Sequence, residues 1–93
     1  MSEPVTTPAD LLDEAKRVIA ERREQHGAPA EHFRAVAACW TALQGHEVTP
    51  AQVCLMLAAS KLVREAHRHH RDNLTDLVGY ADCLAVIRKD ETL

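Results

Sequence analysis

The chain has 93 residues, a formal net charge of −3, and a composition that is 46% hydrophobic and 27% charged. This length predicts one domain rather than a multi-domain enzyme, and the apolar fraction is too high for a disordered chain. Because the net charge is negative, no basic field is expected for a nucleic-acid backbone or an anionic membrane, and we disfavour both as partners.

The composition also indicates how the core is built. Only three residues are aromatic and fifteen are alanine, which favours closely packed helices with an aliphatic core. A short, alanine-rich chain buries little apolar surface, so we expect self-association. No signal peptide or membrane-spanning apolar run is recognised, and three cysteines with no zinc-type spacing favour a reduced, cytoplasmic protein.

Proline and glycine mark the expected starts and ends of two helices in the first half of the chain. Thr7 as N-cap and Pro8 at the first helical position predict a helix start, and Gly27 predicts its end. Pro29 and Gly45 bound the next helix in the same way. The expected helices cover about 8–25 and 29–44, after a disordered tail over 1–6.

The second half of the chain contains similar signals for helix starts. Thr49 and Pro50 start a third helix, and Asp72 or Asn73 caps a fourth after a turn rich in His and Arg. The expected ranges are 50–68 and 72–89. Short connections make neighbouring helices antiparallel. The predicted fold is all-α, a single domain over 7–93 built as a four-helix bundle of two antiparallel hairpins.

The expected third helix is apolar on nearly every side. Such a helix is buried from several directions, either at the centre of the bundle or across a subunit interface. Lys61 and Glu65 share one edge at i, i+4 spacing, where they either pair or point into a shared cavity.

The expected fourth helix has two dissimilar faces. The predicted core stripe consists of Leu74, Leu77, Val78, Ala81, Leu84 and Ala85. The opposite face carries Asp72, Asp76, Gly79, Tyr80 and Cys83. A glycine in mid-helix indicates close approach of another backbone or a ligand. Alternatively, Gly79 and Tyr80 pack on a second subunit, so we expect oligomerisation through the faces of the third and fourth helices.

Asp72 and Asp76 lie one turn apart and are candidate ligands for Mg²⁺, which prefers oxygen donors. The other half of such a site would come from Glu65, Glu31 or a neighbouring subunit.

A zinc site is a weaker alternative for the histidine-rich turn. His67, His69 and His70 with Cys54 or Cys83 supply suitable donors. We disfavour this site because Arg68 and Arg71 in the same stretch would repel a metal. Trp40 is expected in the core, and the cysteines are expected to be small buried hydrophobes.

Several segments carry a family resemblance. They are Gly27, His32–Phe33, Ala37, Trp40, residues 47–50 with Val53 and Met56, Lys61, Arg64, and Asp72 to Ala81. Residues 14–88 resemble small phage and prophage proteins related to the MazG-like, all-α NTP pyrophosphatases. The most specific piece is the Asp-x-x-x-Asp-x-x-Gly-Tyr segment from Asp72 to Tyr80.

The resemblance implies a dimer or tetramer that hydrolyses nucleoside triphosphates to monophosphate and pyrophosphate. It also implies Mg²⁺ held by a Glu-x-x-Glu pair on one helix and a Glu-x-x-Asp pair on the next. Asn73 and Asp76 stand at the second pair, whereas Lys61 and Arg64 stand where the first acidic pair belongs. Lysine cannot ligate Mg²⁺, although the side chains of Lys61 and Arg64 can both contact phosphate.

These considerations give two hypotheses. The first is a MazG-like nucleotide-binding protein with a Mg²⁺-dependent pyrophosphohydrolase activity. Its catalytic residues are Glu65 and Asp76, its nucleotide-binding residues are Lys61, Arg64 and Tyr80, and its metal ligands are Asp72, Asn73 and Asp76. The alternative is an inactive helical homodimer or homotetramer that sequesters a nucleotide or binds a host protein.

Overall fold

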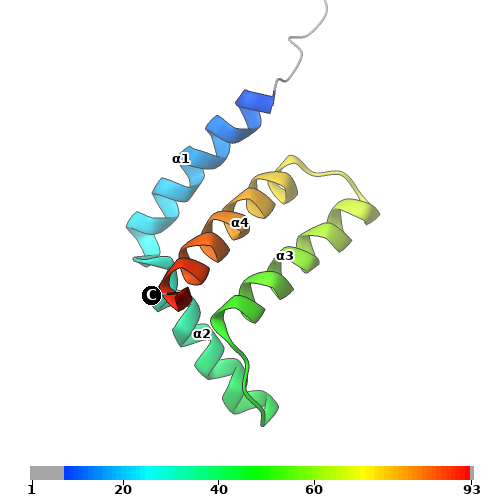
Figure 1. Ribbon diagram of the computed structural model, residues 1–93. Coiled ribbons are helices and arrows are strands. Elements are labelled where there is room, and N and C mark those ends of the chain that lie inside the picture. Colours follow the sequence, from blue (N-terminus) through cyan, green and yellow to red (C-terminus); the bar gives the residue numbers. More distant parts are fainter. Residues whose placement is uncertain (1–7, 93) are drawn as a thin grey trace, which may run out of the picture.

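The computed structural model describes the backbone of residues 8–92 and the side chains of residues 10–90. Its helices are α1 (Pro8–His26), α2 (Pro29–Gln44), α3 (Pro50–His67) and α4 (Arg71–Thr92) (Figure 1). The predicted all-α, four-helix fold is confirmed. The predicted tail over 1–6 and the Thr7 cap lie outside the described residues. Within the described range, no helix is both long and apolar enough to cross a membrane.

The predicted helix boundaries agree with the structure to within about three residues, because local signals set them. Gly27 and Gly45 adopt left-handed backbone conformations, with φ of 80° and 78°, and end α1 and α2. The Thr49 hydroxyl accepts a hydrogen bond from the backbone N–H of Gln52, and the Gln52 side-chain oxygen accepts one from the backbone N–H of Thr49. This reciprocal capping box fixes the start of α3.

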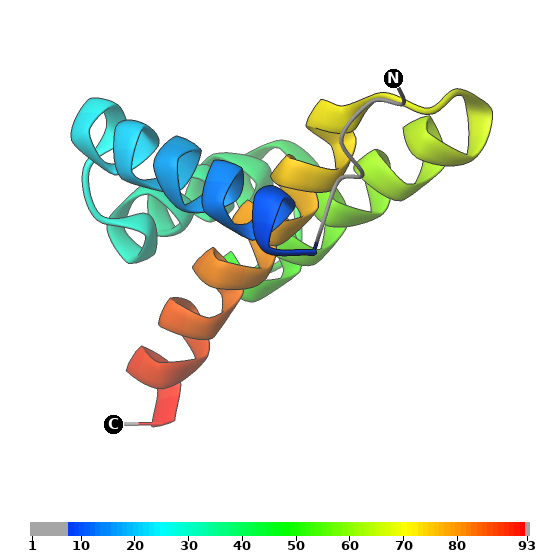
Figure 2. The same ribbon diagram turned by 90° about the horizontal axis from the view of Figure 1, so that it is seen from above.

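Helix α4 is the central helix of the molecule. It lies between α1 and α3, while α2 packs against α3 and one end of α4 (Figure 1). Seen from above, the last turns of α4 run away from α1 (Figure 2). The buried core comprises Phe33, Ala37, Val48, Ala51, Val53, Cys54 and Ile87. Trp40 packs against this core, as predicted.

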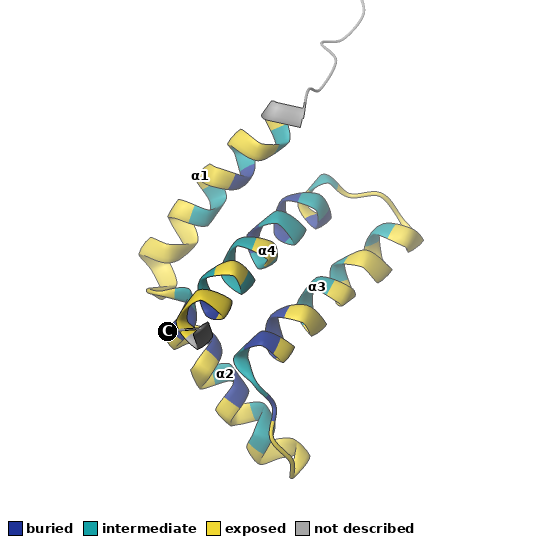
Figure 3. Cartoon of the chain, in the orientation of Figure 1, coloured by how far each residue is buried: buried dark blue, intermediate teal, exposed yellow. Residues whose placement is uncertain are grey.

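Of the two positions expected for α3, the centre of the bundle is wrong, and a subunit interface stays a prediction. Val53 and Cys54 face inward and are buried, but α3 is an edge helix with a large exposed side (Figure 3). We define its outer face as Leu55, Met56, Ala59, Leu62, Val63 and Ala66, all of which are exposed. Helix α3 is therefore apolar on nearly every side because one face lies in the core and the other is left uncovered by the described part of the chain.

The predicted core stripe of α4 is also wrong in part. Ala81 and Ala85 are exposed, whereas Asn73, Thr75 and Asp76 are buried. The reason is that α1 and α3 cover α4 on two sides and supply partners for Asn73 and Asp76, while the Thr75 hydroxyl donates a hydrogen bond to the Asp72 carbonyl of α4 itself. Of the cysteines, Cys54 is buried and Cys83 is half-buried, but Cys39 is exposed, contrary to prediction.

Candidate functional site

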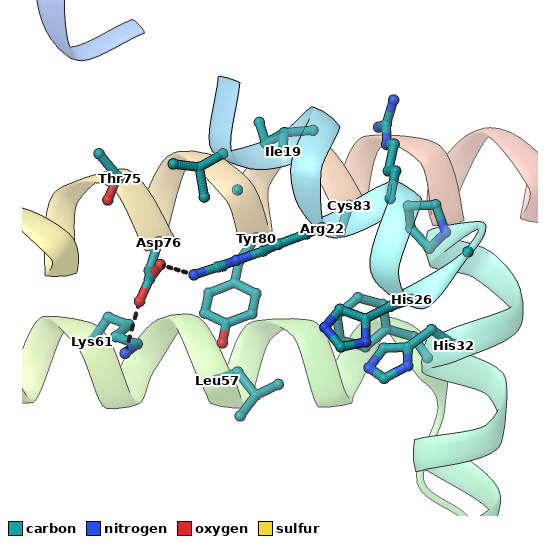
Figure 4. A pocket seen from close by; sticks show the side chains of 16 residues that line it. Ile19, Arg22, His26, His32, Leu57, Lys61, Thr75, Asp76, Tyr80 and Cys83 are labelled. Atoms are coloured by element: carbon teal, nitrogen blue, oxygen red, sulfur yellow. Dashed lines mark hydrogen bonds and ion pairs between the residues drawn. The ribbon is translucent and has the colours of Figure 1, made fainter. Parts of the chain in front are cut away.

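A cavity of about 370 Å³ lies between α1, α3, α4 and the start of α2 (Figure 4). Lys61, Asp76 and Arg22 form one end of it, and His26 and His32 lie at the other. The ring of Tyr80 lies between the two ends (Figure 4). The cavity therefore combines a charged end with an aromatic and imidazole end.

Asp76 is held between two cations. Its Oδ1 accepts a hydrogen bond from Arg22 Nη2 at 2.8 Å, and its Oδ2 lies 2.8 Å from Lys61 Nζ. Burial by itself would raise the pKa of Asp76, but hydrogen bonds from Lys61 and Arg22, together with their charges, lower it below its ordinary value. Asp76 is therefore ionised, and the three residues together carry a net charge of +1.

Three helices position this group. Lys61 continues the inner side of α3, two turns beyond Cys54 and one turn beyond Leu57. Arg22 continues the inward side of α1, which carries Ala15, Val18 and Ile19. Arg22 is not among the site residues predicted from the sequence. The signal was present, because Arg22 follows Ala15, Val18 and Ile19 at spacings of seven, four and three residues and so interrupts an apolar stripe with a charge.

Aromatic and imidazole rings form the opposite end. The rings of His26 and His32 have centroids 5.8 Å apart, and His32 meets Phe33 edge to face at 5.2 Å. Phe33 belongs to the buried core, so its ring is fixed. These rings give this end flat, polarisable surfaces.

Gly79 faces α1 and is buried. A β-carbon built there would lie 4.0 Å from Ile19 Cγ1, which is ordinary van der Waals contact. The neighbour that approaches Gly79 is therefore helix α1 of the same chain. For Gly79 this replaces the alternative of a seam with a second subunit, whereas for Tyr80 that alternative stays a prediction.

Glu65 lies outside the cavity, in the last turn of α3, and faces the connection to α4. Its carboxylate accepts hydrogen bonds from the His69 ring, from the His70 amide at 3.0 Å and from Asn73 Nδ2 at 3.1 Å. These hydrogen bonds lower the pKa of Glu65 to about 2. Glu65 is thus a residue that holds the turn together, and it does not pair with Lys61.

The other predicted site residues line a second, more open cleft beside the cavity. Arg64, Asp72 and Asn73 lie there, and Lys61 and Asp76 border both spaces. The predicted nucleotide-binding residues are thereby divided, because Tyr80 belongs to the cavity, Arg64 to the cleft and Lys61 to both.

The carboxylates do not fit a Mg²⁺ site in this arrangement. Both oxygens of Asp76 are engaged by cations, and those of Glu65 accept hydrogen bonds from the turn. The Asp72 side chain is 75% exposed, and its ionic partner among the described residues is His70, at 3.8 Å. Among the described residues, no three His, Cys, Asp or Glu side chains are arranged to hold a metal ion. A cation at Asp76 would also be repelled by Lys61 and Arg22.

Comparison with known proteins gives a family without an assigned activity. A family model described as a domain of unknown function, DUF6378, matches residues 10–88. The Gene 55 protein of Mycobacterium phage D29 is 32% identical over 82 residues, covering 86% of this chain and 54% of that protein. The Gene 55 protein of Mycobacterium phage L5 is 30% identical over 84 residues, covering 87% and 54%. The chain thus spans about half the length of these relatives, and no solved structure matches it.

Proposed function

We propose that this chain, which belongs to the family described as domain of unknown function DUF6378, binds a nucleotide in the cavity between α1, α3 and α4. The observation that carries the proposal is the pairing of a cationic end, formed by Lys61 and Arg22, with an aromatic end in one cavity. The predicted relationship to phage proteins is confirmed by the Gene 55 relatives.

The cationic end suits phosphate. A lysine ammonium has three donors and an arginine guanidinium has five, while the contacts to Asp76 use one donor of each. The remaining donors are available to phosphate oxygens, and hydrogen bonds between charged partners are the strong ones. Because Lys61 is mostly buried, its charge is also less screened than a surface charge.

The opposite end suits a nucleobase. The His32 and Phe33 rings at this end, and the Tyr80 ring between the two ends, offer flat surfaces on which bases stack for about 1–3 kcal/mol each. The rings accept several bases, since every base has a π-face. The proposal therefore specifies a nucleotide as the ligand class without selecting one base.

The resemblance to MazG-like pyrophosphatases supports the same ligand class, and we retain it as part of the proposal. Hydrolysis with Mg²⁺ stays a prediction. The engagement of Asp76 by two cations favours the alternative predicted from the sequence, a helical protein that sequesters its nucleotide. We retain self-association as a homodimer or homotetramer, and binding of a host protein stays the other form of the alternative.

The test is thermal unfolding with a panel of ribonucleotides and deoxyribonucleotides, each with Mg²⁺ and with a chelator. A ligand at 100 times its dissociation constant adds about 2.7 kcal/mol to the free energy of unfolding. We expect stabilisation in chelator, without pyrophosphate release. Lys61→Ala should weaken affinity about 10- to 100-fold, because a hydrogen bond to a charged group contributes about 1.5–3 kcal/mol.

Lys16→Ala is the matched control, because Lys16 is an exposed lysine on α1 that does not line the cavity. It should bind like the wild type. Stabilisation that requires Mg²⁺ and is accompanied by pyrophosphate release would replace the binding proposal with the pyrophosphohydrolase. Absence of stabilisation by any nucleotide would remove the cavity as a nucleotide site.

A further inference from the structure

The outer face of α3 is an exposed apolar surface that the cavity does not explain. Of the six large apolar side chains that are markedly exposed in the described part of the chain, four lie on it: Leu55, Met56, Leu62 and Val63. At 100° per residue this face is centred opposite the side of α3 that contacts α4. It extends about 17 Å from Leu55 to Ala66 and contains no charge. Apolar patches of this kind mark interaction surfaces.

The spacing on this face indicates that its partner is a helix. Leu55 and Leu62 form one flank, Met56 and Val63 form the other, and each pair is seven residues apart. Ala59 and Ala66, also seven residues apart, lie along the middle. A seven-residue apolar repeat is the pattern of helices that pair along their length. The small central residues allow two backbones to approach closely.

We infer that the outer face of α3 binds the same face of a second copy of this chain, in antiparallel orientation with Ala59 at the two-fold axis. This orientation makes the face self-complementary, as a two-fold interface requires. Along one flank Leu55 lies against Leu62 of the partner subunit. Along the other Met56 lies against Val63 of the partner subunit, and the two Ala59 residues meet between the flanks.

The charges at the two ends of α3 favour the antiparallel order. Exposed Glu47 precedes the helix, and exposed His67 and Arg68 follow the outer face. An antiparallel pair brings Arg68 toward Glu47 of the partner subunit, whereas a parallel pair would bring like charges together. The inference is independent of the proposed nucleotide site, because Lys61 lies on the other side of α3.

The first experiment measures the molar mass of the whole chain by light scattering during size-exclusion chromatography. We expect twice the chain mass for the wild type and a single chain mass for Val63→Glu. The matched control is Leu43→Glu, because Leu43 is 80% exposed but lies on α2. This control should stay dimeric, and circular dichroism should show unchanged helix content in both variants. A monomeric wild type, or dissociation by Leu43→Glu but not by Val63→Glu, would overturn the inference.

The second experiment tests the orientation by disulfide cross-linking. In a Cys39→Ser chain, which removes the exposed native thiol, Ala59→Cys should form an intersubunit disulfide under mild oxidation. Val63→Cys should not, because the two positions would lie about 12 Å apart along antiparallel helices, beyond the reach of a disulfide. Cross-linking through Val63→Cys, or none through Ala59→Cys, would overturn the antiparallel pairing about Ala59.

Discussion

Helices α3 and α4 depart from the usual distribution of polar and apolar residues in opposite senses. Helix α4 buries Asn73, Thr75 and Asp76, and α3 exposes a complete apolar face. The buried polar groups of α4 all have partners: Glu65 for Asn73, the Asp72 carbonyl for Thr75, and two cations for Asp76. The outer face of α3 has no cover within the described chain. Buried polar side chains that have partners within the chain thus mark a site inside the molecule. An exposed apolar surface instead marks a site for another molecule.

The largest expected effect concerns the two aspartates of α4. Asp76→Ala should lower the free energy of unfolding by about 3 kcal/mol, because it leaves the mostly buried Lys61 without its counterion. Asp72→Ala should change it by less than about 0.5 kcal/mol, because the Asp72 side chain is largely exposed. Urea unfolding of both variants measures the difference. Equal losses would show that burial does not distinguish the two residues.

A pair of valines compares the two sides of α3. Val53 is fully buried, so Val53→Ala should cost about 2 kcal/mol at every protein concentration. Val63 is 70% exposed in the single chain, so Val63→Ala should have an effect only where the chain is dimeric. Thermal unfolding over a range of protein concentrations separates the two. A concentration-independent loss in Val63→Ala would place that side chain in the core of one chain.

The two carboxylates with lowered pKa predict sensitivity to acid. The pKa values of Glu65, about 2, and of Asp76 are lower in the folded chain than their ordinary values near 4. The unfolded chain therefore takes up protons first, and stability present above about pH 5 is lost as the pH falls toward 2. In Glu65→Gln the free energy of unfolding should fall less steeply as the pH decreases, which unfolding measurements at several pH values can show. An unchanged slope would show that Glu65 is not held by the turn.

The smallest expected effect is a gain at Gly79. Gly79→Ala should raise the free energy of unfolding by up to about 1 kcal/mol, because alanine favours the helix and its β-carbon meets only Ile19 Cγ1 at 4.0 Å. Chemical denaturation measures it. A loss of stability instead would mean that α1 packs closer to α4 than this contact indicates.

Sequence predicted the helices well because their boundaries depend on near neighbours. Gly27, Pro29 and the Thr49 cap act within one turn, so their effect can be read without knowledge of the fold. The structure also brings together Lys61 and Asp76, which the sequence places in one hypothetical site as a phosphate contact and a metal ligand.

The orientation of α4 could not be predicted in the same way. Whether Asp76 faces solvent or the interior depends on Arg22, which is 54 residues away in sequence, and on Lys61 from α3. Likewise, Glu65 was assigned to catalysis because the local sequence does not show that the turn after His67 folds back onto it. These outcomes depend on tertiary contacts, which helical periodicity does not encode.

The most direct test of the cavity as a metal-independent nucleotide site compares two variants by calorimetric titration in the presence of a chelator. Lys61→Ala should weaken nucleotide binding, because it removes a phosphate donor. Asp76→Asn should bind as tightly as the wild type or more tightly, because neutralising the carboxylate frees Lys61 and Arg22 for phosphate. Loss of binding in Asp76→Asn together with normal binding in Lys61→Ala would contradict the account and assign Asp76 to a metal.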